Sequence, residues 1–298
     1  MDVPARVERY FLRMNAAVAD KARLLDWMHP GRIVEIGPGG GVLLDLIAER
    51  FPGSEVVGLD ASPTVVAALE RRRQVEGRPW QVVTADAFEL DDRFSPGTVD
   101  TVVLCSVLHE IYSYVERAEP GGRPRRFQLA AVAELCQAAF ATLRVGGRLI
   151  IRDGITPPPA IRRLRLLADD AERLFARFVA EFEGRHIAWT RQVDDRLELS
   201  AADAMEFLYT YTWGEASFDH EVREQYGVLP YDAYAEQLLA WCGGPACATV
   251  LALPPDLRSY LQPGYATHLA GKIELTDDAD RPAPWPDSNA VLVVERLR

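Results

Sequence analysis

The chain has 298 residues, of which 48% are hydrophobic, so it can bury a full core in one large domain or two ordinary ones. Its 44 acidic and 33 basic residues give a net charge of −11, a poor electrostatic match for nucleic acid. No apolar run approaches a membrane span, the charged start MDVPARVERYFLRMN is unlike a secretory signal, and the four cysteines are scattered. We therefore expect a cytoplasmic protein with no membrane contact, no disulfides and no nucleic-acid partner.

Strand and helix patterns alternate along the first half of the chain. Apolar residues at helical spacing in 4–28 predict one or two leading helices. Ser62 and Pro63 are suited to the N-cap and the first position of a helix that starts there. Strands are predicted at 31–38, 55–60, 80–87, 99–107 and 144–154, and helices at 41–51, 63–77 and 128–143.

This alternation continues to about residue 155 and is typical of βαβ units. We expect an α/β fold with a doubly wound, mostly parallel, seven-stranded sheet flanked by helices. Ligands bind such sheets outside the carboxyl ends of the strands. The candidate site positions are therefore the strand exits, namely Gly37–Gly41, Asp60, Asp86, Ser106–Glu110 and Asp153.

The pattern changes after the prolines at 157–159. One long charged helix is predicted over 160–184, and further helices over 200–213, with Ser200 as N-cap, and over 231–241. Strand patterns return at 246–254 and 289–298 and would complete the sheet. The predicted organisation is leading helices at 1–30, a core at 31–153, a helical, aromatic cap at 154–245, and closing strands at 246–298 with an insert at 254–288.

The stretch VEIGPGGG at 34–41 indicates the kind of cofactor. A dinucleotide fingerprint needs G-x-G-x-x-G, and neither Gly37 nor Gly39 as a start places a glycine at its last position. An acid followed by G-x-G-x-G fits instead, with Glu35 as the acid. A buried carboxylate there would repel a pyrophosphate but would suit a ligand with an ammonium and a sulfonium. This disfavours a nicotinamide oxidoreductase.

Four features together resemble the class I S-adenosylmethionine-dependent methyltransferases, in particular small-molecule enzymes of bacterial secondary metabolism. They are VEIGPGGG, Asp60 at the end of the second strand, TADAFEL after the third, and the LRVGG turn before the fifth. The resemblance covers roughly residues 31–153 and the closing strands. It implies S-adenosyl-L-methionine as cofactor and S-adenosyl-L-homocysteine as product.

The resemblance also implies how the strand exits bind the cofactor. The glycine turn would pass under its methionine end near Glu35, Asp60 would bind both ribose hydroxyls, and Asp86 would meet the adenine. Each acid also has a plainer interpretation, as a structural carboxylate, a turn residue and a helix N-cap respectively. Tyr10 and Lys21 are candidates to close over the cofactor. The implied cofactor-binding set is Glu35, Gly37, Pro38, Gly39, Asp60, Ala61, Asp86, Ala87 and Ser106.

Catalysis would need an acceptor held in line with the methyl group and a group that takes its proton. His109 is the best base candidate in SVLHEIYSY, because an unperturbed imidazole titrates near working pH. Local hydrogen bonding is the alternative role for His109. The aromatic region 186–268 would sandwich a flat acceptor, with YTYTW as its richest part. The candidate catalytic set is His109, Glu110, Tyr112, Tyr209, Tyr211 and Trp213.

No metal is expected at this site. Glu110 and Asp153 stand where some catechol methyltransferases hold Mg²⁺, but the further acid-and-amide pair that a hard cation needs is not evident. The HE pair at 109–110 lacks the second histidine of a zinc helix.

The sequence thus predicts a methyltransferase acting on a small aromatic or heteroaromatic acceptor of the phenol or indole type, at carbon, nitrogen or oxygen. Two other hypotheses stay open. One is a methyltransferase for a peptide or carrier-bound substrate that docks on 154–245, and the other is a non-catalytic protein that binds adenosylmethionine. Assembly as a homodimer also stays open.

Overall fold

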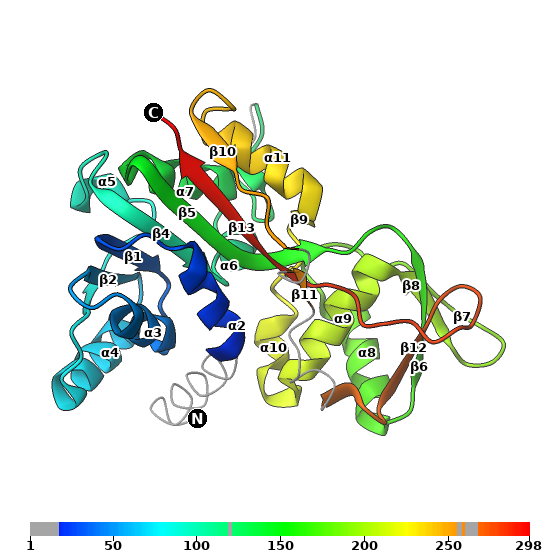
Figure 1. Ribbon diagram of the computed structural model, residues 1–298. Helices are drawn as coiled ribbons and strands as arrows, with labels where there is room; N and C mark the ends of the chain where they lie inside the picture. Colours follow the sequence, from blue (N-terminus) through cyan, green and yellow to red (C-terminus); the bar gives the residue numbers. More distant parts are fainter. Residues whose placement is uncertain (1–17, 119–120, 255–257, 260–267) are drawn as a thin grey trace.

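The computed structural model describes residues 18–118, 121–254, 258–259 and 268–298. Figure 1 shows two lobes, one built on a long twisted sheet with helices on both faces and a smaller one to its right. The predicted leading helices start before the described residues, and Tyr10 lies outside them. In the described part of the chain, no helix is both long and apolar enough to cross a bilayer.

The first lobe has the predicted alternation of strands and helices. Ser62 caps α4, because its hydroxyl accepts a hydrogen bond from Val65 N at 3.4 Å and Pro63 follows as the first helical residue. The strands are β1 (Arg32–Ile36), β2 (Glu55–Asp60), β3 (Gln81–Thr84), β4 (Val99–Cys105) and β5 (Leu143–Thr156). The helices are α2 (Val18–Ala22), the 3-10 helix η1 (Arg23–Trp27), α3 (Val42–Arg50), α4 (Pro63–Glu76), α5 (Leu90–Arg93), α6 (Leu108–Tyr114) and α7 (Leu129–Thr142).

The central sheet follows the strand order β10-β13-β5-β4-β1-β2-β3. Strands β1 to β5 are parallel, whereas β13 (Asn289–Arg296) runs antiparallel between β5 and β10 (Ala248–Val250). Two short strands, β9 (Leu229–Pro230) and β11 (Arg258–Ser259), pair with β5 and β13. The predicted doubly wound, mostly parallel sheet with two closing strands is confirmed.

Side-chain alternation in the strands produces two apolar layers. Val34 and Ile36 pack with α6, α7 and α11 (Tyr231–Trp241) on one face, whereas Ile33 packs with η1 and α3 on the other. Consecutive strand residues therefore face different helices, which decides where each polar side chain at a strand exit points.

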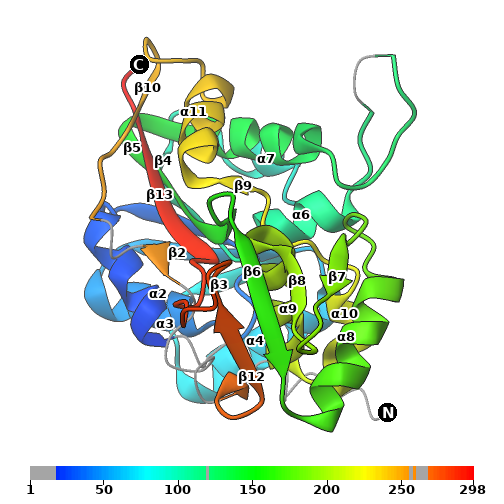
Figure 2. The ribbon, with the colours of Figure 1, turned by 90° about the vertical axis from the view of Figure 1, so that its right-hand side faces the viewer.

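The second lobe differs from the sequence-based expectation in its secondary structure. The prediction of one helix over 160–184 is wrong, because residues 161–166 form β6 (Ile161–Leu166) and only α8 (Asp169–Glu181) is helical. β6 lies in an antiparallel sheet of order β12-β6-β8-β7, shown side by side in Figure 2. β6 pairs with β12 (Ile273–Thr276) and β8 (Leu197–Ser200), which are distant in sequence, and β8 pairs in turn with β7 (Trp189–Arg191).

Helices pack on one face of this second sheet. Ser200 caps α9 (Ala201–Trp213) through Asp203 N at 3.0 Å, as predicted, and η2 (Glu215–Ser217) and α10 (Phe218–Glu221) follow. The buried rings of Phe175, Phe178 and Phe207 make edge or tilted contacts at the centre of this lobe.

The chain crosses between the lobes more than once. Strand β12, which lies in the expected insert, belongs to the second sheet, whereas α11, from the expected cap, packs with α7 on the first lobe. The domain boundaries proposed from sequence therefore stay a prediction. The carboxyl ends of the central strands, α2, α6 and α9 come together between the lobes, and this is where the candidate site lies (Figure 1).

Candidate active site

The loop after β1 depends on glycine. Gly37, Gly39 and Gly41 have φ of 67°, 52° and 73°, a region that other residues rarely adopt. A Cβ on Gly37 would lie 2.7 Å from Val107 Cγ2, so a side chain there would also collide with the start of the α6 segment. The loop can therefore turn closely past the exits of β1 and β4.

Glu35 precedes this loop, near the end of β1. Its side chain is on β1 and only 1% of the residue is exposed, and among the described residues Oε2 has no hydrogen-bond partner. Burial raises the pKa of Glu35 to about 7, although the nearby Lys21 ammonium acts in the opposite direction. A buried acceptor without a partner is costly, and a ligand ammonium would satisfy it.

Asp60 and Asp86 lie at neighbouring strand exits. Asp60 ends β2, its Oδ1 accepts from Ser62 N at 2.8 Å, and burial raises its pKa. Asp86 follows β3, is exposed, and accepts from Phe88 N at 3.0 Å. The Ala85 N–H donates to the Asp60 carbonyl, so the two acids, with Ala61 and Ala87 beside them, are brought together. Each acid makes a local turn bond and both are placed at the predicted edge.

Ser106 follows β4 in a strained conformation with a φ of 61°. Its N–H donates to the Arg152 carbonyl at 2.7 Å, and its hydroxyl accepts from Arg152 Nη1 at 2.8 Å. Arg152 is buried, and its Nε donates to Asp20 Oδ2 on α2 at 2.6 Å. Sequence reasoning placed Ser106 at this exit but missed Arg152 and Asp20.

His109 is held by Asp153 from the adjacent strand exit. Its Nδ1 lies 2.6 Å from Asp153 Oδ1, and its Nε2 lies 3.8 Å from a carboxylate oxygen of Glu224. Burial alone would lower the pKa of His109, but the carboxylates of Asp153, Glu224 and Glu110 raise it to about 10. The imidazole is therefore charged at neutral pH, and this geometry favours an ion-paired role over that of a free base.

The other two predicted residues of α6 are Glu110 and Tyr112. Glu110 is half-buried; burial raises its pKa to about 7, and the charge of His109 opposes the shift. Tyr112 is half-buried too, and its ring meets that of Phe127 edge-on at 5.7 Å. Glu110 is thus a carboxyl group of α6 whose titration falls near working pH.

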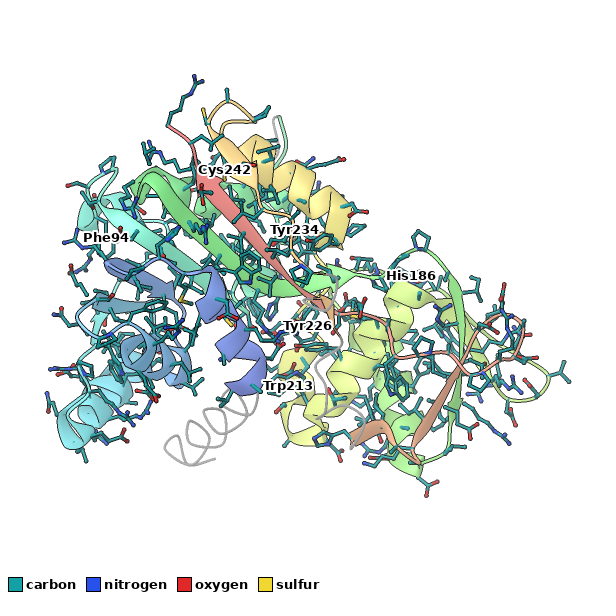
Figure 3. The ribbon with its side chains drawn as sticks, viewed as in Figure 1. Phe94, His186, Trp213, Tyr226, Tyr234 and Cys242 are labelled. Atoms are coloured by element: carbon teal, nitrogen blue, oxygen red, sulfur yellow. The ribbon has the colours of Figure 1, made fainter. Side chains whose placement is uncertain are left out.

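The three predicted aromatic residues of α9 have different surroundings. The Tyr209 ring lies 3.7 Å from that of Tyr226, and the Tyr226 ring lies 5.1 Å from the His109 ring. The Tyr211 hydroxyl instead donates to Asp170 Oδ1 at 3.0 Å, within the core of the second lobe. Trp213 is half-buried at the end of α9. Figure 3 shows Tyr226 where the two lobes meet.

The segment after α10 supplies a buried polar cluster that sequence reasoning missed. Tyr226 N and Gly227 N donate to the carboxylate of Glu206 at 3.0 and 2.9 Å, and the Tyr226 hydroxyl donates to Glu221. A Cβ on Gly154 would lie 1.8 Å from the Tyr226 carbonyl oxygen, so β5 and this segment touch backbone to backbone. The sequence signal was the set of acids within an apolar, aromatic stretch, namely Glu206, Glu221 and Glu224.

Metal ligation is not indicated by the side chains that the structure describes. Across those ranges, no three His, Cys, Asp or Glu residues are placed to hold an ion. The cysteines Cys105, Cys136, Cys242 and Cys247 are all free thiols.

Comparison with known proteins identifies the first lobe. Residues 34–148 match the family model of the methyltransferase domain. The demethylmenaquinone methyltransferase of Thermus thermophilus is 30% identical over 130 residues, which are 44% of this chain and 50% of that protein. The release factor glutamine methyltransferase of Geobacter sulfurreducens is 27% identical over 134 residues, which are 43% of this chain and 46% of that protein. The chain thus spans half or less of the length of these curated relatives.

One solved structure agrees with this chain in fold. The plantazolicin methyltransferase BamL, in complex with a triazolic desmethylPZN analogue and SAH, covers 99% of this chain and 91% of its own at a TM-score of 0.52 and 12% identity. At that identity the likeness concerns the fold alone. Residues 34–148 therefore form a methyltransferase domain of Rossmann-like fold, as the sequence resemblance predicted.

Proposed function

We propose that the protein is an S-adenosyl-L-methionine-dependent methyltransferase that methylates a small aromatic or heteroaromatic molecule. The observation that carries the proposal is Glu35, a buried carboxylate with an unpartnered oxygen under the glycine loop of a methyltransferase domain. The cofactor supplies a methyl group on a sulfonium and leaves as S-adenosyl-L-homocysteine. Its cationic amino-acid end suits this carboxylate.

The remaining strand exits hold the rest of the cofactor. Asp60 binds the ribose hydroxyls, for which a short carboxylate at the end of β2 is suited, and Asp86 meets the adenine after β3. Pro38 and Gly39 lie in the turn that passes under the methionine end of the cofactor, beside Ser106. These roles agree with the placement of the acids on adjacent strands.

The acceptor lies on the side of α6 and α9. The rings of Tyr209 and Tyr226 make a tilted contact beside His109, and such an aromatic wall favours a flat acceptor and excludes water. The main contribution of these residues to catalysis is to position the acceptor in line with the methyl group.

The acceptor's proton must leave when its oxygen, nitrogen or ring carbon takes the methyl group. Glu110 is the proposed proton acceptor, because its pKa of about 7 matches working pH. His109 holds its own proton between Asp153 and Glu224 and serves to position α6 and to balance the charge of the nearby carboxylates. The base therefore shifts by one residue from the first sequence-based choice, within the same candidate set.

A carrier-bound or peptide substrate is the second candidate. Large apolar side chains are exposed along the second sheet and would suit docking of a larger partner. They are Ile161, Leu167, Trp189 and Val193.

Transfer of labelled methyl from adenosylmethionine into an extract of the source cells, split into small-molecule and macromolecular fractions, tests both candidates. Label among small molecules supports the proposal and provides a mass for the acceptor. Label on protein supports the docking alternative. No label in either fraction, with cofactor binding intact, would favour a non-catalytic binding protein.

A further inference from the structure

Three side chains line up across adjacent strands on the α2 face of the sheet. β1, β4 and β5 are neighbours, with Glu35 opposite Val103 and Cys105 opposite Arg152 in register. Because side chains alternate, Glu35, Cys105 and Arg152 share one face, whereas Asp153 points to the α6 face. A buried acid and a buried base therefore lie on either side of a small neutral residue.

Helix α2 places two opposite charges over this row. The Asp20 carboxylate accepts from Arg152 Nε at 2.6 Å, and the next residue, Lys21, is only 6% exposed. Lys21 acts to lower the pKa of both Glu35 and Cys105, so its ammonium lies within electrostatic reach of this row. Adjacent residues of α2 thus carry a carboxylate toward Arg152 and an ammonium toward Glu35.

An α-amino acid carries the same two charges in the same proximity. A guanidinium is suited to binding a carboxylate through parallel hydrogen bonds, and a buried carboxylate is suited to an ammonium. Arg152 is oriented for this role, because its Nη1 donates to Ser106 Oγ at 2.8 Å. The unpartnered Oε2 of Glu35, which is buried in the same row, independently indicates that a ligand group belongs there.

This inference rests on the proposed function. We infer that Arg152 binds the α-carboxylate of the cofactor and that Asp20 is an internal competitor for the same guanidinium. Cofactor binding then requires the Asp20 carboxylate to move off Arg152. The exchange affects ligands that carry the amino-acid end and leaves recognition of the adenosine part unchanged.

Two probes separate these parts by calorimetry. S-adenosyl-L-homocysteine carries the amino-acid end, whereas 5′-methylthioadenosine lacks its amine and carboxylate. Arg152→Met should weaken binding of the homocysteine probe about tenfold or more, the size of a lost hydrogen bond to a charged group. Asp20→Asn should tighten it by about two- to fivefold, since a partly exposed ion pair is worth up to about 1 kcal/mol. Neither change should alter affinity for methylthioadenosine.

Arg148→Met is the matched control. Arg148 is on the same strand but outside the row of Glu35, Cys105 and Arg152, and its Nε lies 2.9 Å from a carboxylate oxygen of Glu295. It should leave both affinities unchanged. If Arg152→Met weakens binding of both probes equally, Arg152 has a structural role and the inference is overturned. The inference is also overturned if Asp20→Asn leaves the affinity for S-adenosyl-L-homocysteine unchanged or lowers it. If Arg152→Met does not fold, the half-buried Asp20 still provides the test. If the wild-type protein binds neither probe, the proposed function fails with it; if it binds both and only the variants disagree, the inference alone fails.

Discussion

His109 on α6 and Asp153 at the end of β5 are joined by a contact of 2.6 Å between Nδ1 and Oδ1. The second oxygen of Asp153 accepts from Val107 N at 2.8 Å and from Leu108 N at 2.6 Å. One carboxylate thus fixes both the start of α6 and the ring that projects from it. Glu224 lies on the other side of the ring, so the imidazole is placed between carboxylates from both lobes.

This arrangement makes stability depend on pH. The folded-state pKa of His109, about 10, is above the ordinary value of 6.5, so its contribution is fully present below 6.5 and is lost as pH rises through about 10. His109→Gln should lower the free energy of unfolding by about 3 kcal/mol at the acid end of that window, the lower range for a buried pair that loses one partner. The difference from wild type should shrink toward the alkaline end in thermal unfolding series.

His186→Gln is the control for this series, because His186 is exposed on the second lobe. It should change the free energy of unfolding only slightly. A loss for His109→Gln that stays constant across the window would contradict the charged imidazole.

The pKa of Glu35 predicts a pH dependence of cofactor binding. Burial raises this pKa to about 7, and the ionised carboxylate is the form that attracts an ammonium. Affinity for S-adenosyl-L-homocysteine should therefore rise as pH increases through about 7 and then level off. Glu35→Gln should bind more weakly and should lose this rise in calorimetric titrations. An unchanged rise in the variant would assign the titrating group elsewhere.

The proposed contact of Asp60 with the ribose predicts a loss of affinity for S-adenosyl-L-homocysteine when its carboxylate is removed. Asp60→Ala should weaken homocysteine-probe binding by about 1.5–3 kcal/mol, the range for a hydrogen bond to a charged group. Asp60→Asn keeps an acceptor for Ser62 N, so its affinity for the probe should lie between that of wild type and that of Asp60→Ala. Glu55→Gln, at the other end of β2, is the control and should bind like wild type. Unchanged affinity in Asp60→Ala would remove the ribose assignment.

Local patterns predicted the elements of the first lobe but could not predict β6. The Arg-rich segment 161–166 lies in a run that favours a helix, yet it forms a strand whose Arg163 makes ion pairs with Glu198 at 2.8 Å and with Asp280 at 2.7 Å. These partners are 35 and 117 residues away. Contacts at such separations override local propensity, and no window of the sequence contains them.

The same distinction holds for the site. Glu35, Asp60 and Ser106 follow from strand exits, because parallel strands end at one edge. The Asp20–Arg152 pair joins residues 132 apart, and the close approach of Tyr226 to Gly154 on β5 depends on how the second lobe sits on that strand. The sequence therefore could not predict which of these residues contact one another, even where it indicated the residues themselves.

Tyr209 and Tyr211 provide the sharpest test of the acceptor side, because they are two residues apart on α9 and face different neighbours. Tyr209→Ala removes the ring that contacts Tyr226 and should slow turnover of the acceptor found in the extract, through a loss of about 0.5–1.5 kcal/mol of transition-state stabilisation. Tyr209→Phe keeps the ring and should retain most of the rate. Tyr211→Phe removes the bond to Asp170 and should lower the free energy of unfolding by about 0.5–1.5 kcal/mol at unchanged turnover. If Tyr211→Phe slows turnover while Tyr209→Ala does not, the acceptor lies on the other face of α9, and the rings of Tyr209 and Tyr226 beside His109 serve packing only.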